Sequence, residues 1–167
     1  MKPISLCLIQ MGDKGLELVR AFPDVVPSHT LTEIITKSMP MGAKDGDFTS
    51  NVIGEKNAFS GYVFAIPSTI GRSNIASICA IFDNSSYDVN SVRKIFSLII
   101  NEMKKYDVIK TDILYKILPT LFKSFESDKI TIKISSVVTI EIDNTGRDEP
   151  VEPLKKSVNN FESDMWK

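Results

Sequence analysis

The sequence predicts an α/β domain of the α+β type, in which helices pack on the faces of a five-stranded antiparallel sheet. Short apolar or alternating runs separated by turn residues fill the first half of the chain. Apolar residues at helical spacing fill much of the second half. The predicted order is strand, strand, helix, three strands, helix, helix, and no internal repeat or heptad array competes with this interpretation.

Two strands and a helix open the predicted fold. Ile4–Met11 and Leu16–Phe22 are apolar or alternating runs on either side of a Gly/Asp turn, which predicts an antiparallel hairpin. A short helix is expected over His29–Ser38, because its leucine and isoleucines recur at helical spacing. Ser28 is the expected N-cap, and Pro40 follows the end of the helix.

Three further strands are expected to complete the sheet. They are Phe48–Ile53, Phe59–Ile66 and Asn74–Phe82, separated by one Gly/Lys/Asn turn and by a second turn over Pro67–Arg72. The run Ile75–Phe82 is apolar nearly throughout, which is typical of a strand that is covered on both faces or central in its sheet.

Two amphipathic helices follow the sheet. The first spans Val89–Lys105, with Asp88 or Ser86 as its cap. The second spans Thr111–Phe125, and its first residue is a natural N-cap. Pro119 lies inside the second helix and is expected to kink or divide it, because proline lacks a backbone donor and crowds the preceding turn.

The last predicted element is one added strand over Ile130–Ile142, bent near Ser135 and Ser136. Beyond Asp143 the chain becomes polar and contains two prolines. The expected organisation is therefore one domain over residues 1–143 and a polar C-terminal tail over residues 144–167.

Composition narrows the function classes. The 167 residues are 43% hydrophobic and carry 20 basic and 21 acidic side chains, a net charge of −1, so neither nucleic acid binding nor attachment to an anionic membrane is expected. Cys7 and Cys79 lie in apolar runs and are expected to be buried free thiols in a reducing cytoplasm. No apolar run is long enough to span a bilayer, and the N-terminus lacks the pattern of a signal peptide.

The sequence offers few residues for chemistry of its own. The glycines around Asp13 are not followed by the lysine and hydroxyl of a phosphate loop, so a hairpin turn is expected there. His29, the only histidine, has no evident nucleophile as a partner. Asp45 and Asp47 flank Gly46, which indicates a loop turn and not a metal site. We therefore expect no catalytic centre, metal or cofactor in this chain.

The order of the elements over roughly residues 1–126 resembles the longin family. The string IGRSNIASICAIFDNSSYDVNSVRKIFSLI is similar to a segment of the nitrogen-permease-regulator and folliculin proteins within that family. The resemblance implies a longin-like sandwich that binds proteins, with a small GTPase or a longin or roadblock-type subunit as the partner. The single domain with a short tail would suit an archaeal member of the trafficking-type longins.

The resemblance also implies a role for one arginine. In the nitrogen-permease-regulator and folliculin proteins, an arginine on this loop stimulates GTP hydrolysis by a Rag-type GTPase, and Arg72 is the residue here that matches it. Gly71, Ser73 and Asn74 would shape its turn and contact the partner. A guanidinium on a tight turn can stabilise the charge that develops on a transferred phosphoryl group. The alternative is that Arg72 is a solvated turn residue.

Three functions remain open at this stage. The chain is a non-enzymatic binding module, a GTPase-activating subunit that supplies Arg72, or a structural light subunit of a coat or tethering complex. Longin sheets can present an edge strand to a partner, so a dimer with itself or with a related chain is expected. The tail sequence FESDMW can either dock into a groove on another protein or pack on its own domain.

Overall fold

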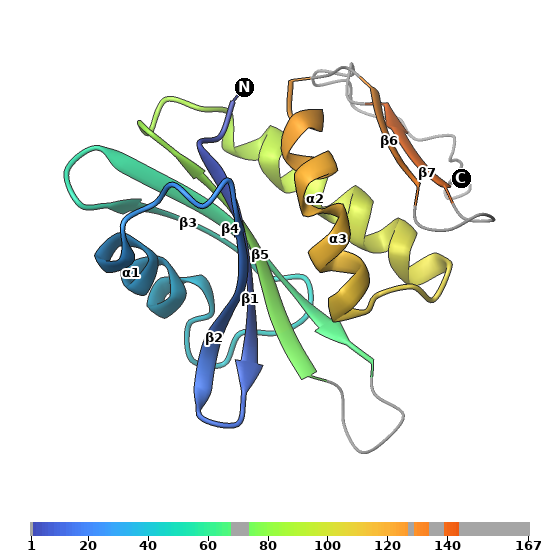
Figure 1. The fold of residues 1–167 in the computed structure, drawn as a ribbon, viewed down its shortest axis with the longest axis horizontal. Helices are drawn as coiled ribbons and strands as arrows, with labels where there is room; N and C mark the ends of the chain where they lie inside the picture. The colour runs from blue at the N-terminus through green and yellow to red at the C-terminus, as the bar shows by residue number, and fades with distance from the viewer. Residues whose placement is uncertain (1, 68–73, 127–128, 134–138, 144–167) are drawn as a thin grey trace.

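The computed structural model describes residues 2–67, 74–126, 129–133 and 139–143. It confirms the α+β class (Figure 1): a five-stranded antiparallel sheet carries helices on both faces, and a small two-stranded sheet lies beside two of the helices. The elements are β1 (Ser5–Gly12), β2 (Gly15–Phe22), α1 (Ser28–Ser38), β3 (Phe48–Ile53), β4 (Asn57–Ile66), β5 (Asn74–Phe82), α2 (Val89–Lys105), α3 (Thr111–Ser124), β6 (Lys129–Lys133) and β7 (Thr139–Asp143).

The strand order in the large sheet is β2-β1-β5-β4-β3, so β5 is central and β2 and β3 are the edges. The register places Cys7 opposite Cys79 between β1 and β5, and Tyr62 opposite Ile78 between β4 and β5. Seven of the nine residues of β5 are buried. This burial confirms the central position that the apolar run predicted, because both faces of β5 are covered.

The two faces of the sheet carry different helices (Figure 1). Helices α2 and α3 cover one face, where they meet alternate residues of the strands such as Leu8, Phe64 and Ile78. The shorter α1 covers the other face, where Ile34 packs with Phe59 and other residues of opposite parity. The period of two along each strand therefore sorts the apolar side chains into two cores.

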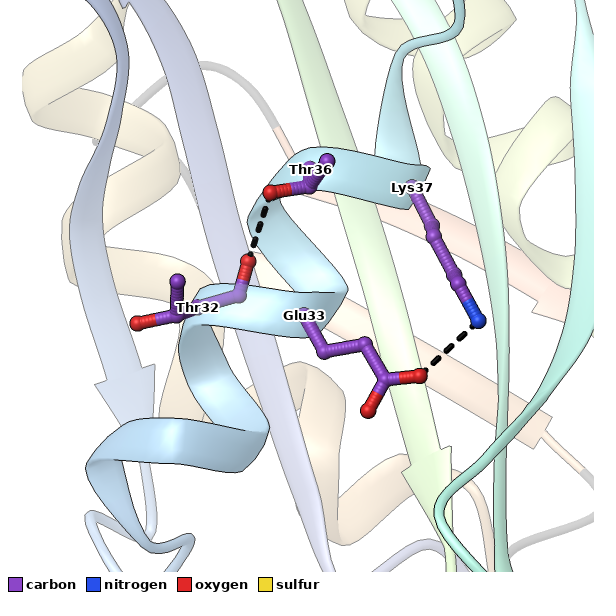
Figure 2. A network of polar contacts seen from close by, with 4 residues as sticks. All are labelled: Thr32, Glu33, Thr36 and Lys37. Atoms are coloured by element: carbon purple, nitrogen blue, oxygen red, sulfur yellow. Dashed lines mark hydrogen bonds and ion pairs between the residues drawn. The ribbon is translucent and has the colours of Figure 1, made fainter.

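Helix α1 is held to the sheet by its apolar side and carries polar contacts on the other. Lys37 Nζ lies 2.8 Å from Glu33 Oε2, and Thr36 Oγ1 donates to the carbonyl of Thr32 at 2.9 Å (Figure 2). The predicted N-cap is wrong: Pro27 holds that position and Ser28 is already helical. Proline has the extended backbone angles that a cap requires, and the cap makes no side-chain hydrogen bond.

Helix α2 is capped as predicted. Asp88 accepts hydrogen bonds from the backbone N–H groups of Asn90 and Ser91, and its other oxygen accepts from the Ser91 hydroxyl at 2.7 Å. The Ser91 bonds in particular lower the pKa of the Asp88 carboxyl, because they favour its charged form. An anchored N-terminus fixes the direction in which α2 crosses the sheet.

Helix α3 runs through Pro119 without being divided, contrary to one of the two predicted outcomes. Proline cannot donate to the carbonyl of Tyr115, four residues earlier. Arg20 of β2 replaces that donor, because its Nη1 lies 2.6 Å from the Tyr115 oxygen. The cap of α3 also differs from the prediction: Lys110 is the N-cap, and the Thr111 hydroxyl donates to Gln10 Oε1 of β1 at 2.9 Å.

The predicted single strand over Ile130–Ile142 is wrong. The structure has two antiparallel strands, β6 and β7, with Ile132 opposite Ile140. Alternation of apolar and polar residues is the same for one bent strand and for the two arms of a hairpin, so the pattern could not separate them. Both isoleucines are buried in the core cluster of α2 and α3, and the hairpin therefore covers these helices.

The buried face of α2 yields a test of the assigned core. Ile99 is 1% exposed, whereas its neighbour Leu98 is 36% exposed. We expect Ile99→Asp to lower the free energy of unfolding by about 3 kcal/mol or more, because it buries a carboxylate without a partner. Leu98→Asp is the matched control and should cost much less. Urea denaturation measures both, and equal midpoints for Ile99→Asp and the unmodified protein would refute the assigned face.

Candidate functional site

The predicted partner-binding turn lies almost wholly outside the described residues. Gly71, Arg72 and Ser73 belong to that part of the chain, so their proposed roles stay predictions. Asn74 is described: it begins β5, and its Nδ2 donates to the carbonyl of Met11 at 2.9 Å. Its side chain therefore ties the start of β5 to the end of β1.

The other polar residues that the sequence singled out hold local structure. Asp47 Oδ2 accepts from the Lys44 N–H at 2.8 Å, which is the expected role in a turn. Asp45 accepts from the Ala65 N–H and pairs with Lys104 of α2 at 2.7 Å. His29 is exposed. Within the described ranges, no three His, Cys, Asp or Glu side chains cluster as a metal site would require, and no helix is long and apolar enough to cross a membrane.

The two cysteines are buried and free, as predicted. Burial raises the pKa of the Cys7 thiol well above its usual range, and it raises the pKa of Cys79 to about 12. Reaction requires the thiolate, so neither side chain is a ready nucleophile at neutral pH.

One surface feature stands apart, the outer edge of β3. This strand pairs with β4 on one side and has no other strand beside it in the described part of the sheet (Figure 1). Ser50, Asn51 and Val52 are exposed, and Val52 keeps 53% of its surface accessible. An edge of this kind presents unpaired backbone donors and acceptors.

The hydrogen bonds before β3 show which of its backbone groups point outward. Val63 donates to the carbonyl of Asp47, and Val63 in turn accepts from the N–H of Gly46. Gly46 has φ +97°, so the two residues form a bulge of the type that begins with a left-handed glycine. From Asp47 onward, residues whose backbone groups bond to β4 alternate with residues whose N–H and C=O groups point away from it. The residues with outward groups are Phe48, Ser50 and Val52.

The side chains of these three residues lie on the α2 face. The Phe48 ring lies 5.7 Å from the Arg93 guanidinium. The Ser50 hydroxyl lies 3.1 Å from both the Ser60 and Tyr87 hydroxyls, and the latter two are 2.7 Å apart. Tyr87 also stacks on Phe82 at 3.8 Å between ring centroids. The middle of β3 is therefore fixed from behind while its outer edge stays open.

The opposite edge is built differently. The register of β2 against β1 shifts after Leu8, so that β2 contains a bulge. Arg20 of β2 lies over the Tyr115 ring at 4.5 Å, and Glu17 adds a second charge to the strand. Bulges and charged side chains are the common devices that prevent a strand edge from pairing. By contrast, β3 reads FTSNVI and contains neither a charge nor a proline.

The structure thus identifies β3, which sequence reasoning did not separate from the other strands. The sequence predicted that some edge strand would bind a partner, but it did not say which one, because periodicity does not report the order of strands in a sheet. The composition of the strand does not single it out, because β1, β4 and β5 also contain no charged residue. What the site can do is accept the backbone of another extended segment.

The polar cluster behind β3 yields a second test. We expect Tyr87→Phe to lower the free energy of unfolding by about 1 kcal/mol, because Ser60 is fully buried and loses its shortest hydrogen-bond partner. Tyr106→Phe, at an exposed tyrosine, is the control and should have little effect. Chemical denaturation compares the two variants, and equal stabilities would show that the cluster does not hold β3.

Comparison with known proteins identifies no family for this chain. No protein-family model matches the chain, and no curated protein matches it.

Proposed function

We propose that this protein is a non-enzymatic, cytoplasmic protein-interaction module of the longin type that binds its partner along the open edge of β3. The observation that carries the proposal is the contrast between the two edges of one sheet. The β2 edge is bulged and charged, whereas the β3 edge offers the backbone groups of Phe48, Ser50 and Val52 without such protection.

The physical basis is strand addition. Backbone hydrogen bonds from the edge to a partner's extended segment supply affinity, and the side chains at alternate positions supply specificity. Val52 is the largest exposed apolar side chain on β3, so it is the natural point of contact. The partner classes that fit the longin resemblance are a longin or roadblock-type subunit, which has a sheet edge of its own, and a small GTPase.

A GTPase-activating role for Arg72 is the second proposal. Residues 67–73 join β4 to β5, and the two strands pair as far as Ile66 and Asn74. An arginine supplied in trans to bound GTP accelerates hydrolysis by about three to five orders of magnitude. The role of a light subunit in a coat or tethering complex is the third, and it requires a constitutive large partner with no dependence on nucleotide.

Substitution at Val52 tests the binding proposal. We expect Val52→Lys to reduce partner capture from source lysate by at least about tenfold, because a lysine on an edge strand opposes pairing. Val25 is also an exposed valine, at 64%, but lies outside β3, so Val25→Lys should capture normally. Mass spectrometry identifies the partner, and binding is repeated with purified proteins. Equal affinity of both variants and the unmodified protein for the purified partner would remove β3 as the site.

Single-turnover GTP hydrolysis tests the second proposal. The measurement requires a GTPase captured as a partner, and it compares the unmodified protein with Arg72→Lys and Arg72→Ala. A catalytic arginine should lose most of its effect in both variants, since lysine lacks the planar fork of guanidinium. A contact that depends only on charge should survive in Arg72→Lys. Identical rates for all three proteins would refute the catalytic role of Arg72 and leave only the binding-module proposal.

A further inference from the structure

We propose that the occupant of the β3 edge is the β3 edge of a second copy of this chain, so that the two five-stranded sheets join into one across a twofold axis. The inference rests on the proposed function and names its partner. It follows from the register that β3 permits, from the side chains that this register brings together, and from the absence of charge along the strand.

The register is determined by the outward backbone groups. In an antiparallel pair, outward groups of one strand must meet outward groups of the other. Phe48, Ser50 and Val52 carry them, and only one register pairs all three on both copies. It places Ser50 opposite Ser50 of the second copy and Phe48 opposite Val52. Three such pairs give about six hydrogen bonds between the chains.

The register also pairs apolar side chains on the α2 face. Val52 of each copy lies opposite Phe48 of the other, and Phe48 is only half-buried in the single chain. A β-branched residue against an aromatic ring is a favourable cross-strand pair. Each copy supplies both members, so the contact forms twice, as a twofold interface requires.

The other face of the joined strands is polar and uncharged. There Thr49 of one copy lies opposite Asn51 of the other. Like charges directly opposite each other are a common obstacle to pairing a strand with itself. No residue of β3 is charged, so the two paired strands place no like charges opposite each other. A ladder this short buries little surface, so we expect a dimer that dissociates on dilution.

Cysteine cross-linking tests the register directly. Thr49 and Asn51 form pairs without mutual hydrogen bonds, whose Cα atoms lie about 4.5 Å apart, within the range of a disulfide. The Thr49→Cys, Asn51→Cys double variant should therefore form a covalent dimer under mild oxidation. Each single variant alone should stay monomeric on a non-reducing gel, whereas a mixture of the two single variants should cross-link. The native cysteines are buried and serve as an internal control.

Light scattering over a range of concentrations supplies the second measurement. As concentration rises, the unmodified protein and Val25→Lys should approach the mass of a dimer. Val52→Lys should remain a monomer up to a concentration at least tenfold higher than the one at which the unmodified protein dimerises. Efficient cross-linking of a single cysteine variant would overturn the proposed register. A monomeric unmodified protein would overturn the homodimer, and if a different partner still requires Val52, the proposed function survives that result. If Val52→Lys binds every partner normally, both proposals fail.

Discussion

A strand at the edge of a sheet carries backbone donors and acceptors that no neighbouring strand satisfies, and this constraint governs how the rest of the molecule is arranged. The chain meets it differently at its two edges. At β2, a bulge opposite Leu8 and Ile9 of β1 disrupts regular pairing, and Arg20 donates to the Tyr115 carbonyl of α3. At β3, the strand stays regular over Phe48–Ile53. One edge is thus irregular and charged, whereas the other is regular and uncharged.

Several side-chain contacts connect the edge strand β3 to the rest of the sheet. Tyr87 stacks on Phe82 of β5 and joins its hydroxyl to Ser50 and Ser60, which connects the edge strand to the centre of the sheet. The bulge at Gly46 ends the free edge before the first residue of β3. Beyond the bulge, the Asp45 carboxylate accepts a hydrogen bond from the Ala65 N–H. The open stretch is therefore short and defined, which limits the registers that a partner can adopt.

The fold class and most element bounds followed from the sequence, because periods of two and 3.6 report directly which residues are buried. The errors came from features that periodicity does not carry. Alternation is the same for one bent strand and for the antiparallel pair of β6 and β7. Periodicity also carries no information on the hydrogen bond from Arg20 to the Tyr115 carbonyl, which replaces the donor that Pro119 lacks. The strand order, and with it the identity of β3 as an edge, depends on contacts between distant segments.

The exchange rates of the β3 backbone amides test the central claim most directly. Phe48, Ser50 and Val52 carry outward N–H groups, while those of Thr49 and Asn51 face β4. Residue-resolved hydrogen exchange by NMR should show the outward amides exchanging rapidly in dilute protein and becoming protected as concentration rises, with the inward amides protected throughout. Rapid exchange of the three outward amides at every concentration and with every captured partner would contradict the account.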